Sequence, residues 1–150
     1  MQTPGVIFIK LIEQMREHIN VNKLMEAILK HVSEGNILTR FANRFLPVFI
    51  LQKANIEDFK QTCIPELKSR FFSAPLTWCL EFKSRNNQKA VRSEYYAIIK
   101  ECIASTGLNH LVSFDDADVE VLVECFRDIL IFCLLPGYKA TYKKYNMQAL

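Results

Sequence analysis

The sequence has few of the residues that build common nucleotide-binding and metal-binding motifs. Its 150 residues include only four glycines, each isolated from the others, so no G-x-G-x-x-G or Walker loop is present. The five cysteines form no C-x-x-C pair, and the three histidines form no H-x-x-x-H pair. The common nucleotide-binding enzymes are therefore excluded. The cysteines are interpreted as buried, reduced thiols rather than zinc ligands.

Catalytic and targeting motifs are also missing. No serine lies in a G-x-S-x-G motif, so we expect a protein that is not an enzyme and needs no cofactor. Asp115, Asp116, Asp118 and Glu120 lack the glycine of a calcium loop and are interpreted as a solvated turn, so no metal is expected. The apolar run at residues 129–135 is far shorter than the roughly 20 residues of a membrane span. We expect an intracellular protein with no membrane contact, because unpaired cysteines suit a reducing compartment.

Hydrophobic periodicity predicts an α/β (α+β) fold in which helices cover a sheet. Strands are expected over residues 6–11, 44–51, 77–82, 119–125 and 129–135. Helices are expected over residues 21–32, 56–64, 65–72, 94–106 and 138–147. Asn20, Asn55 and Ser93 are the expected N-caps, and Pro65 is expected to separate two helices. A boundary is predicted between residues 1–52 and 53–150.

Three segments contain basic residues and no acidic residue: residues 35–56, 82–93 and 129–150. They contribute ten positive charges to a formal net charge of +3, so the rest of the chain carries a net −7. If the fold brings the three segments together, one face is strongly basic, as in proteins that bind nucleic acids. If they point in different directions, the charges only keep the protein in solution. The candidate basic residues are Arg40, Arg44, Lys83, Arg85, Lys89, Arg92, Lys139, Lys143 and Lys144.

The polar loop over residues 83–89 lies between an expected strand and an expected helix. Arginine provides a planar fork for phosphate, and the amides of Asn86 and Asn87 can read a sugar or a base edge. The N-terminus of the following helix also favours phosphate. The alternative is a solvated turn whose asparagines adopt left-handed geometry. The residues leave both interpretations open.

These residues resemble those of a known family. The loop, with Arg92 and Glu94 after it, resembles the K-x-R-N-N and R-x-E signature of eukaryotic THUMP-domain proteins, in particular the tRNA acetyltransferase adaptors. Residues 44–48 resemble that family's R-x-L-P-I/V strand, and residues 138–148 resemble its closing Y-K…K-Y-N-L-Q element. Residues 115–118 depart from the Asn-Pro-Asp found in the family. The resemblance covers nearly the whole chain.

The resemblance implies a fold, a function and a location in the nucleus, nucleolus or cytoplasm. The fold would be an N-terminal ferredoxin-like β-α-β portion followed by a THUMP domain (α-α-β-α-β-β) with a C-terminal helix. The function would be that of a non-catalytic tRNA-binding adaptor, which presents tRNA to an RNA cytidine acetyltransferase for N4-acetylcytidine formation. The family's usual target is the acceptor stem with its 3′ CCA end.

Two alternatives remain open at this stage. The protein could serve another tRNA-modifying enzyme, such as a methyltransferase, as its RNA-binding subunit. It could also be a protein–protein scaffold without direct RNA contact. Whether it forms a homodimer is not decided by the sequence.

Overall fold

A computed structural model describes residues 6–11, 15, 18–35, 42–141, 143–147 and 149, and the described strands form one sheet. The strands are β1 (Ile50–Lys53), β2 (Thr77–Arg85), β3 (Leu111–Val112), β4 (Val119–Phe126) and β5 (Ile129–Pro136), in the spatial order β1-β5-β4-β2-β3. The helices are α2 (Val21–Ser33), α3 (Ile56–Phe71), α4 (Arg92–Ala104) and the short 3-10 helix η1 (Lys143–Tyr145). The predicted α+β class is confirmed. Among these helices none is long and apolar enough to cross a membrane.

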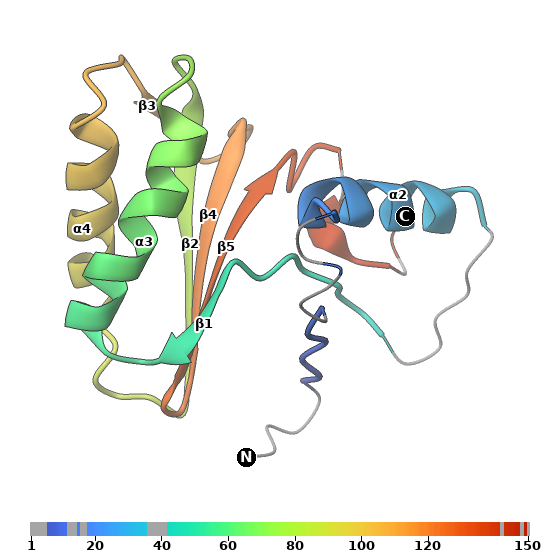
Figure 1. Ribbon diagram of the computed structural model, residues 1–150, viewed down its shortest axis with the longest axis horizontal. Coiled ribbons are helices and arrows are strands. Elements are labelled where there is room, and N and C mark those ends of the chain that lie inside the picture. The colour runs from blue at the N-terminus through green and yellow to red at the C-terminus, as the bar shows by residue number, and fades with distance from the viewer. Residues whose placement is uncertain are drawn as a thin grey trace.

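The sheet has two ends with different surroundings. β2 and β4 are parallel and stop together, with Arg85 opposite Phe126. We call this the loop end, because the β2–α4 loop and the β4–β5 turn both lie here. β3 pairs with the first residues of β2, Trp78 lying opposite Val112. That opposite end is called the β3 end (Figure 1).

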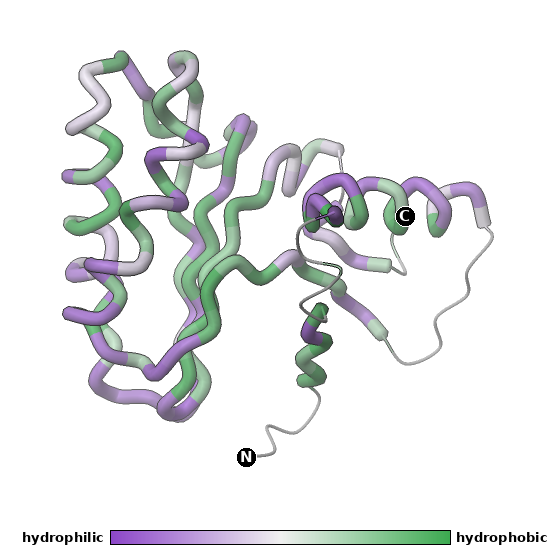
Figure 2. Tube along the Cα trace, viewed as in Figure 1, coloured by the Kyte–Doolittle hydropathy of each residue, from purple (hydrophilic) through white to green (hydrophobic). Residues whose placement is uncertain are grey.

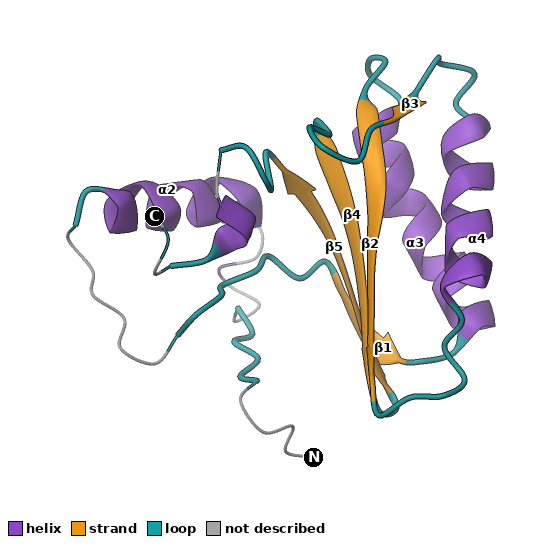
Figure 3. Ribbon diagram, turned by 180° about the vertical axis from the view of Figure 1, so that it is seen from behind, coloured by secondary structure: helices purple, strands orange, loops and turns teal. Residues whose placement is uncertain are grey.

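The two faces of the sheet bury different clusters. α3 and α4 cover one face, whereas α2 and the C-terminal segment lie on the other side (Figure 3). Val119, Val121 and Val123 point toward α3 and α4, as their alternation in the sequence predicts. Leu122 packs on the other face with α2 and the C-terminal segment. β4 and β5 are therefore buried on both faces, and Figure 2 shows them as predominantly hydrophobic.

The predicted N-caps of the first two helices are confirmed. Asn20 Oδ1 accepts hydrogen bonds from the backbone N–H groups of Asn22 and Lys23, at 3.0 and 3.2 Å. Asn55 Oδ1 accepts from the second and third residues of α3 in the same way, at 2.8 and 3.3 Å. Each asparagine satisfies N–H groups that have no partner inside the helix.

The predicted helix break at Pro65 is wrong, because α3 runs through the proline. A proline inside a helix costs about 3 kcal/mol. The buried residues of α3 lie four apart on both sides of it: Phe59, Cys63, Leu67 and Phe71. Burying each such side chain contributes about 1.5–3 kcal/mol, so the continuous stripe outweighs the break. Pro65 itself is exposed, where water can solvate the carbonyl group that its missing N–H leaves unpaired.

The N-terminal strands differ from expectation. Residues 6–11 form no strand, and the exposed Ile7 and Ile9 face no neighbouring strand that would bury them. The strand expected over residues 44–51 is reduced to β1 and to an isolated bridge between Arg44 and Asn146. β1 pairs with β5, so it belongs to the main sheet. The division of the chain after residue 52 stays a prediction.

The helix expected at residues 138–147 is also wrong. Lys143, Lys144 and Tyr145 have φ values of 45°, 61° and 55°, which no right-handed helix contains. The rings of Tyr138 and Tyr145 are both buried, with their centres 5.9 Å apart. A helix would separate these residues by about 10.5 Å along its axis. The chain instead turns back, with the N–H of Lys144 donating to the carbonyl oxygen of Tyr138 at 2.6 Å.

Candidate nucleic-acid interface

The loop after β2 is fixed against the β4–β5 turn. The N–H of Arg127 donates to the carbonyl oxygen of Arg85 at 2.9 Å, and Asn87 Nδ2 donates to the carbonyl oxygen of Arg127. Ser84 Oγ donates to the carbonyl oxygen of Asn87 at 2.7 Å. Asn86 is exposed with a φ of 55°, a left-handed conformation that asparagine tolerates. The loop is therefore held in a defined shape.

Asn87 also determines how the chain enters α4. Its Oδ1 accepts hydrogen bonds from the N–H groups of Lys89 and Ala90, both at 2.9 Å. α4 then begins with Val91 at the N-cap and no capping side chain, so the expected cap at Ser93 is wrong. The turn that Asn87 stabilises starts the helix earlier and places Ser93 in its first turn. The side-chain amide of Asn87 thus has a structural role in the loop.

Arg85 is exposed and yet held in place. Its side chain is 61% exposed, and its Nε lies 3.4 Å from Glu124 Oε1. Its guanidinium carbon lies 5.5 Å from the ring centre of Phe126. The Glu124 side chain is only 4% exposed, so water screens this ion pair less than it screens a surface pair. Because the pair uses Nε, the two Nη groups remain as donors for a phosphate.

Two other candidate lysines are paired with carboxylates. Lys83 Nζ lies 3.3 Å from Glu81 Oε1. Lys139 Nζ lies 3.0 Å from Oε1 of Glu120, whose side chain is 1% exposed, and it also donates to the carbonyl oxygen of Phe114. The hydrogen bond to Glu120 raises the pKa of Lys139, so this lysine stays charged at neutral pH. Part of the positive charge that the sequence places here is therefore neutralised inside the protein.

Arg44 and the C-terminal segment lie together. Arg44 Nη2 donates to the hydroxyl oxygen of Tyr138, and the guanidinium carbon lies 5.8 Å from that ring's centre. Burial raises the pKa of Tyr138 to about 12, so its hydroxyl group stays protonated. Lys143 and Lys144 are exposed on the same segment. These bases form a second group beside α2.

The structure places the described candidate residues in two groups, and their convergence on one groove stays a prediction. The loop group comprises Lys83, Arg85, Asn86, Asn87, Lys89 and Arg92, and the tail group comprises Arg44, Lys139, Lys143 and Lys144. Arg40 lies outside the described residues. The two groups are anchored on the same strand, β4: Glu124 pairs with Arg85 of the loop group, and Glu120 pairs with Lys139 of the tail group. Four residues of a strand separate these two glutamates by about 13 Å.

Two exposed bases at the loop end were not selected from the sequence. Arg127 lies in the β4–β5 turn, and Lys53 lies opposite Ile129 in the pairing of β1 with β5. The N–H of Ala54, the residue after β1, donates to the carbonyl oxygen of Asp128 at 2.7 Å. This bond holds the end of β1 against the β4–β5 turn. An Arg-Asp pair between two apolar strands predicts a hairpin turn. It does not indicate which loop lies beside that turn.

The described cysteines are unsuited to nucleophilic catalysis. All five are free and buried. Burial raises the pKa of the Cys63 and Cys79 thiols to about 12, and burial also raises the pKa of Cys133. A thiol becomes a good nucleophile only when its pKa is lowered. Within the described ranges, no three His, Cys, Asp or Glu side chains are placed to hold a metal ion.

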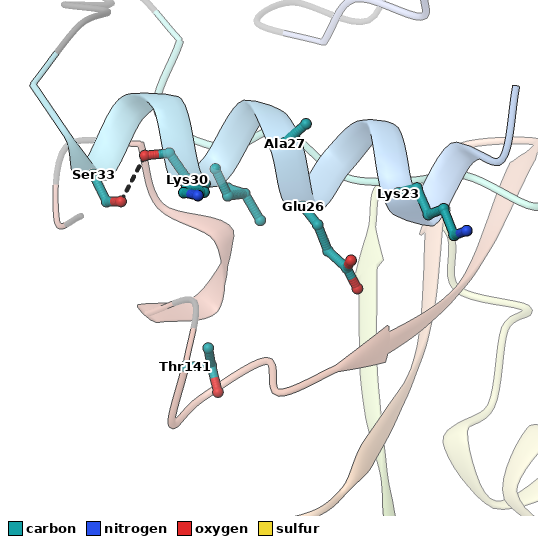
Figure 4. Close-up of a pocket in the computed structure, with 7 residues that line it drawn as sticks. Lys23, Glu26, Ala27, Lys30, Ser33 and Thr141 are labelled. Carbon is teal, nitrogen blue, oxygen red and sulfur yellow. Dashed lines mark hydrogen bonds between the residues drawn. The ribbon is translucent and has the colours of Figure 1, made fainter.

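An open hollow of about 500 Å³ lies between α2 and the C-terminal segment (Figure 4). Its lining includes Lys23, Glu26, Lys30, Ser33 and Thr141. Ser33 Oγ donates to the carbonyl oxygen of Lys30 at 2.7 Å, so this hydroxyl group is engaged within the helix. The hollow adds bases near the tail group and shows no pairing of a nucleophile with a base.

Comparison with known proteins gives a family. Residues 53–135 match the THUMP domain model. The Drosophila melanogaster "THUMP domain-containing protein 1 homolog" is 23% identical over 83% of this chain and 40% of its own length. The Mus musculus "THUMP domain-containing protein 1" is 27% identical over 96% of this chain and 40% of its own length. The Saccharomyces cerevisiae "tRNA acetyltransferase TAN1" is 32% identical over 90% of this chain and 50% of its own length. The chain thus spans at most half the length of these relatives.

Solved structures give partial overlaps. A 4-thiouridine synthetase in complex with RNA and ATP overlaps with a TM-score of 0.49 and 14% identity, over 80% of this chain and 39% of that chain. A predicted N6-adenine-specific DNA methylase from Listeria monocytogenes overlaps with a TM-score of 0.48 and 15% identity, over 71% of this chain and 30% of that chain. The match over residues 53–135 shows, as the sequence predicted, that the chain belongs to the THUMP-domain family.

Proposed function

We propose that this protein is a non-catalytic tRNA-binding adaptor that presents tRNA to an RNA cytidine acetyltransferase for N4-acetylcytidine formation. Family membership and a relative named as a tRNA acetyltransferase support the class of function. The observation that carries the proposal is Arg85, an exposed guanidinium that a buried carboxylate and an aromatic ring hold at the loop end. A base held in this way loses less side-chain entropy when it binds a phosphate.

The surroundings of Arg85 suit a single-stranded RNA end. Lys89 and Arg92 are exposed on the loop and on the first turn of α4, and Arg127 is exposed on the adjacent turn. α4 has no capping side chain, so its N-terminal N–H groups add to the attraction for phosphate. The tail group offers a second set of phosphate contacts to an RNA that extends from the loop end toward the C-terminal segment. We expect the target to be the acceptor stem with its 3′ CCA end.

The acidic residues near the loop group would restrict where an RNA can bind. Glu124 and Glu120 are buried and each holds one base, while Asp128 and Glu94 lie exposed at the loop end. Like charges repel a phosphate, so an RNA must follow the path that the exposed bases leave open. Binding on this surface depends on the RNA's shape as well as its charge.

The proposal is tested by mass spectrometry of tRNA nucleosides from a strain that lacks the gene. We expect N4-acetylcytidine to disappear and the methylated nucleosides to stay unchanged. Unchanged N4-acetylcytidine would overturn the adaptor role, and loss of one methyl mark instead would assign the protein to a methyltransferase.

The RNA target is tested by filter binding with tRNA that carries or lacks its 3′ CCA end. We expect weaker binding to the truncated tRNA, because the loop group then loses its single-stranded ligand. Equal binding of the two tRNAs would place the contact elsewhere on the tRNA. An absence of binding to either would favour a scaffold without RNA contact.

A further inference from the structure

Among the described strands, β3 is a two-residue strand at the edge of the sheet, and hydrogen bonds to β2 occupy one side of its backbone. The N–H groups of Leu111 and Ser113 donate to the carbonyl oxygens of Leu76 and Trp78 at 3.2 and 3.0 Å. Peptide groups alternate in direction along a strand, so the N–H and carbonyl groups of Val112 point away from β2. The outer edge of β3 therefore offers one donor and one acceptor, the N–H and carbonyl groups of Val112, to an added strand.

The side chains around this edge are apolar and exposed. Leu111, Val112 and Phe114 are 58%, 42% and 66% exposed. Trp78 belongs to the cluster under α4, so Val112, its partner in register, lies on that face and Leu111 lies on the other. An edge strand with apolar side chains on both faces and no charge within it is normally covered in the working protein.

A hollow of about 460 Å³ lies beside the edge, between β3 and the C-terminal end of α4. Its lining includes Trp78, Ile103, Leu108, Val112 and, as a base, Lys100. A strand added to β3 would direct alternate side chains toward this hollow. The hollow therefore selects an apolar side chain at that position of the added strand.

Charge decides between the candidate occupants. β3 is followed by the exposed Asp115 and Asp116, and residues 105–120 contain no lysine or arginine. Lys139 reaches this turn at the carbonyl oxygen of Phe114, but it is already paired with Glu120. An RNA would be repelled by this turn. A second copy paired antiparallel through β3 about a two-fold axis would place its acidic turn beside residues 108–110, which contain no lysine or arginine to attract it. The turn attracts a different protein segment that carries a basic residue.

We propose that the free edge of β3 docks an extended segment of the modifying enzyme, apolar at alternate positions and basic near Asp115 and Asp116, which adds a strand to the sheet. This inference rests on the proposed function, which supplies an enzyme partner. β2 connects the two sites, and its length from Thr77 to Arg85 corresponds to about 26 Å. RNA at the loop end and the enzyme at the β3 end therefore do not compete, and an adaptor needs both at once.

Val112→Pro tests the proposal, because proline removes the outward N–H and leaves the bonds of Leu111 and Ser113 to β2 in place. Val112→Thr is the matched control, since it is similar in shape and keeps the N–H. Each variant is titrated with the purified RNA cytidine acetyltransferase of the same organism and, separately, with tRNA. We expect V112P to bind the enzyme about tenfold more weakly than V112T. A ratio of this size is expected when one hydrogen bond is lost and the proline ring blocks the edge. Binding to tRNA should be unchanged in both variants.

The outcomes separate this inference from the proposed function. Equal enzyme affinity of V112P and V112T overturns the docking site and leaves the adaptor role standing. Failure of the unmutated chain to bind the enzyme overturns both. A dimer of the unmutated chain that V112P converts to a monomer would show that a second copy occupies the edge, and would overturn docking of the enzyme.

A second variant covers the case in which V112P does not fold. Asp115→Asn with Asp116→Asn keeps the shape of the exposed turn and removes its charge. We expect this double variant to bind the enzyme more weakly at low salt and to lose most of the salt dependence of that binding. An unchanged affinity and salt dependence overturn the charge complementarity on which the choice of occupant depends.

Discussion

Replacing Arg85 by alanine should weaken both RNA binding and stability, because the side chain faces solvent and also pairs with a buried carboxylate. A second replacement, at Glu124, then separates the two effects. Arg85→Ala removes one phosphate contact and leaves Glu124, only 4% exposed, without its cation. Loss of that partner costs about 1–3 kcal/mol of unfolding free energy. For about 2 kcal/mol, the Tm of a chain of this size falls by about 4–8 °C. Adding Glu124→Gln to Arg85→Ala removes the unpaired charge, so the double variant should regain most of this loss.

Binding should respond differently from stability. The single and double variants both lack the Arg85 guanidinium, so both should bind tRNA equally weakly. The slope of log affinity against log salt should fall by about 0.7–0.9 in each, corresponding to one phosphate contact. Thermal unfolding and filter binding at several salt concentrations measure the two effects. Wild-type affinity and slope in R85A would remove Arg85 from the interface. A double variant as unstable as R85A would show that Glu124 does not depend on this arginine.

Two further predictions concern the frame that carries the interface. Asp118 Oδ2 accepts hydrogen bonds from the N–H and Oγ1 of Thr77, both at 2.8 Å, and the backbone bond lowers the pKa of Asp118. The resulting stabilisation is present above the unfolded pKa of about 3.9 and is lost as pH falls through the folded value. The difference in urea-unfolding free energy between the unmutated chain and Asp118→Asn should therefore shrink from pH 5 to pH 3, and a constant difference would contradict the pairing. Pro65→Ala should raise the unfolding free energy by up to about 3 kcal/mol, because it restores a helical N–H at an exposed position; no gain would show that α3 accommodates the proline without cost.

Local elements could be predicted where the signal lies within a few neighbouring residues. The asparagine caps of α2 and α3 follow from the chemistry of Asn20 and Asn55 alone. The alternation of β4 follows in the same way from its valines and glutamates. Two elements differ from prediction because burial overrides local preference. The buried residues of α3 outweigh the cost of Pro65 inside the helix. The C-terminal segment turns back so that the rings of Tyr138 and Tyr145 can pack together.

In the candidate interface, too, local sequence signals could be predicted and contacts between distant residues could not. Sequence motifs indicated the loop after β2, because its arginine and asparagines are contiguous. They did not indicate that Arg127 lies beside this loop, or that Glu124 and Glu120 hold Arg85 and Lys139. Each of these contacts joins residues at least 19 positions apart, and the order of strands in the sheet decides which of them meet.

By itself, then, the sequence determined the mixed class of fold, the N-caps of α2 and α3, the alternation of β4 and the motifs of the family. The class of fold, the caps and the alternation depend on periodicity and short-range hydrogen bonding, which act between residues a few positions apart. The family rests on the resemblance of the loop and tail motifs. Only the tertiary structure decided that the described candidate bases form a loop group and a tail group, that three of them are paired with glutamates, and that no other described strand covers the outer edge of β3. Those features depend on which strands become neighbours and on how much water is excluded between them.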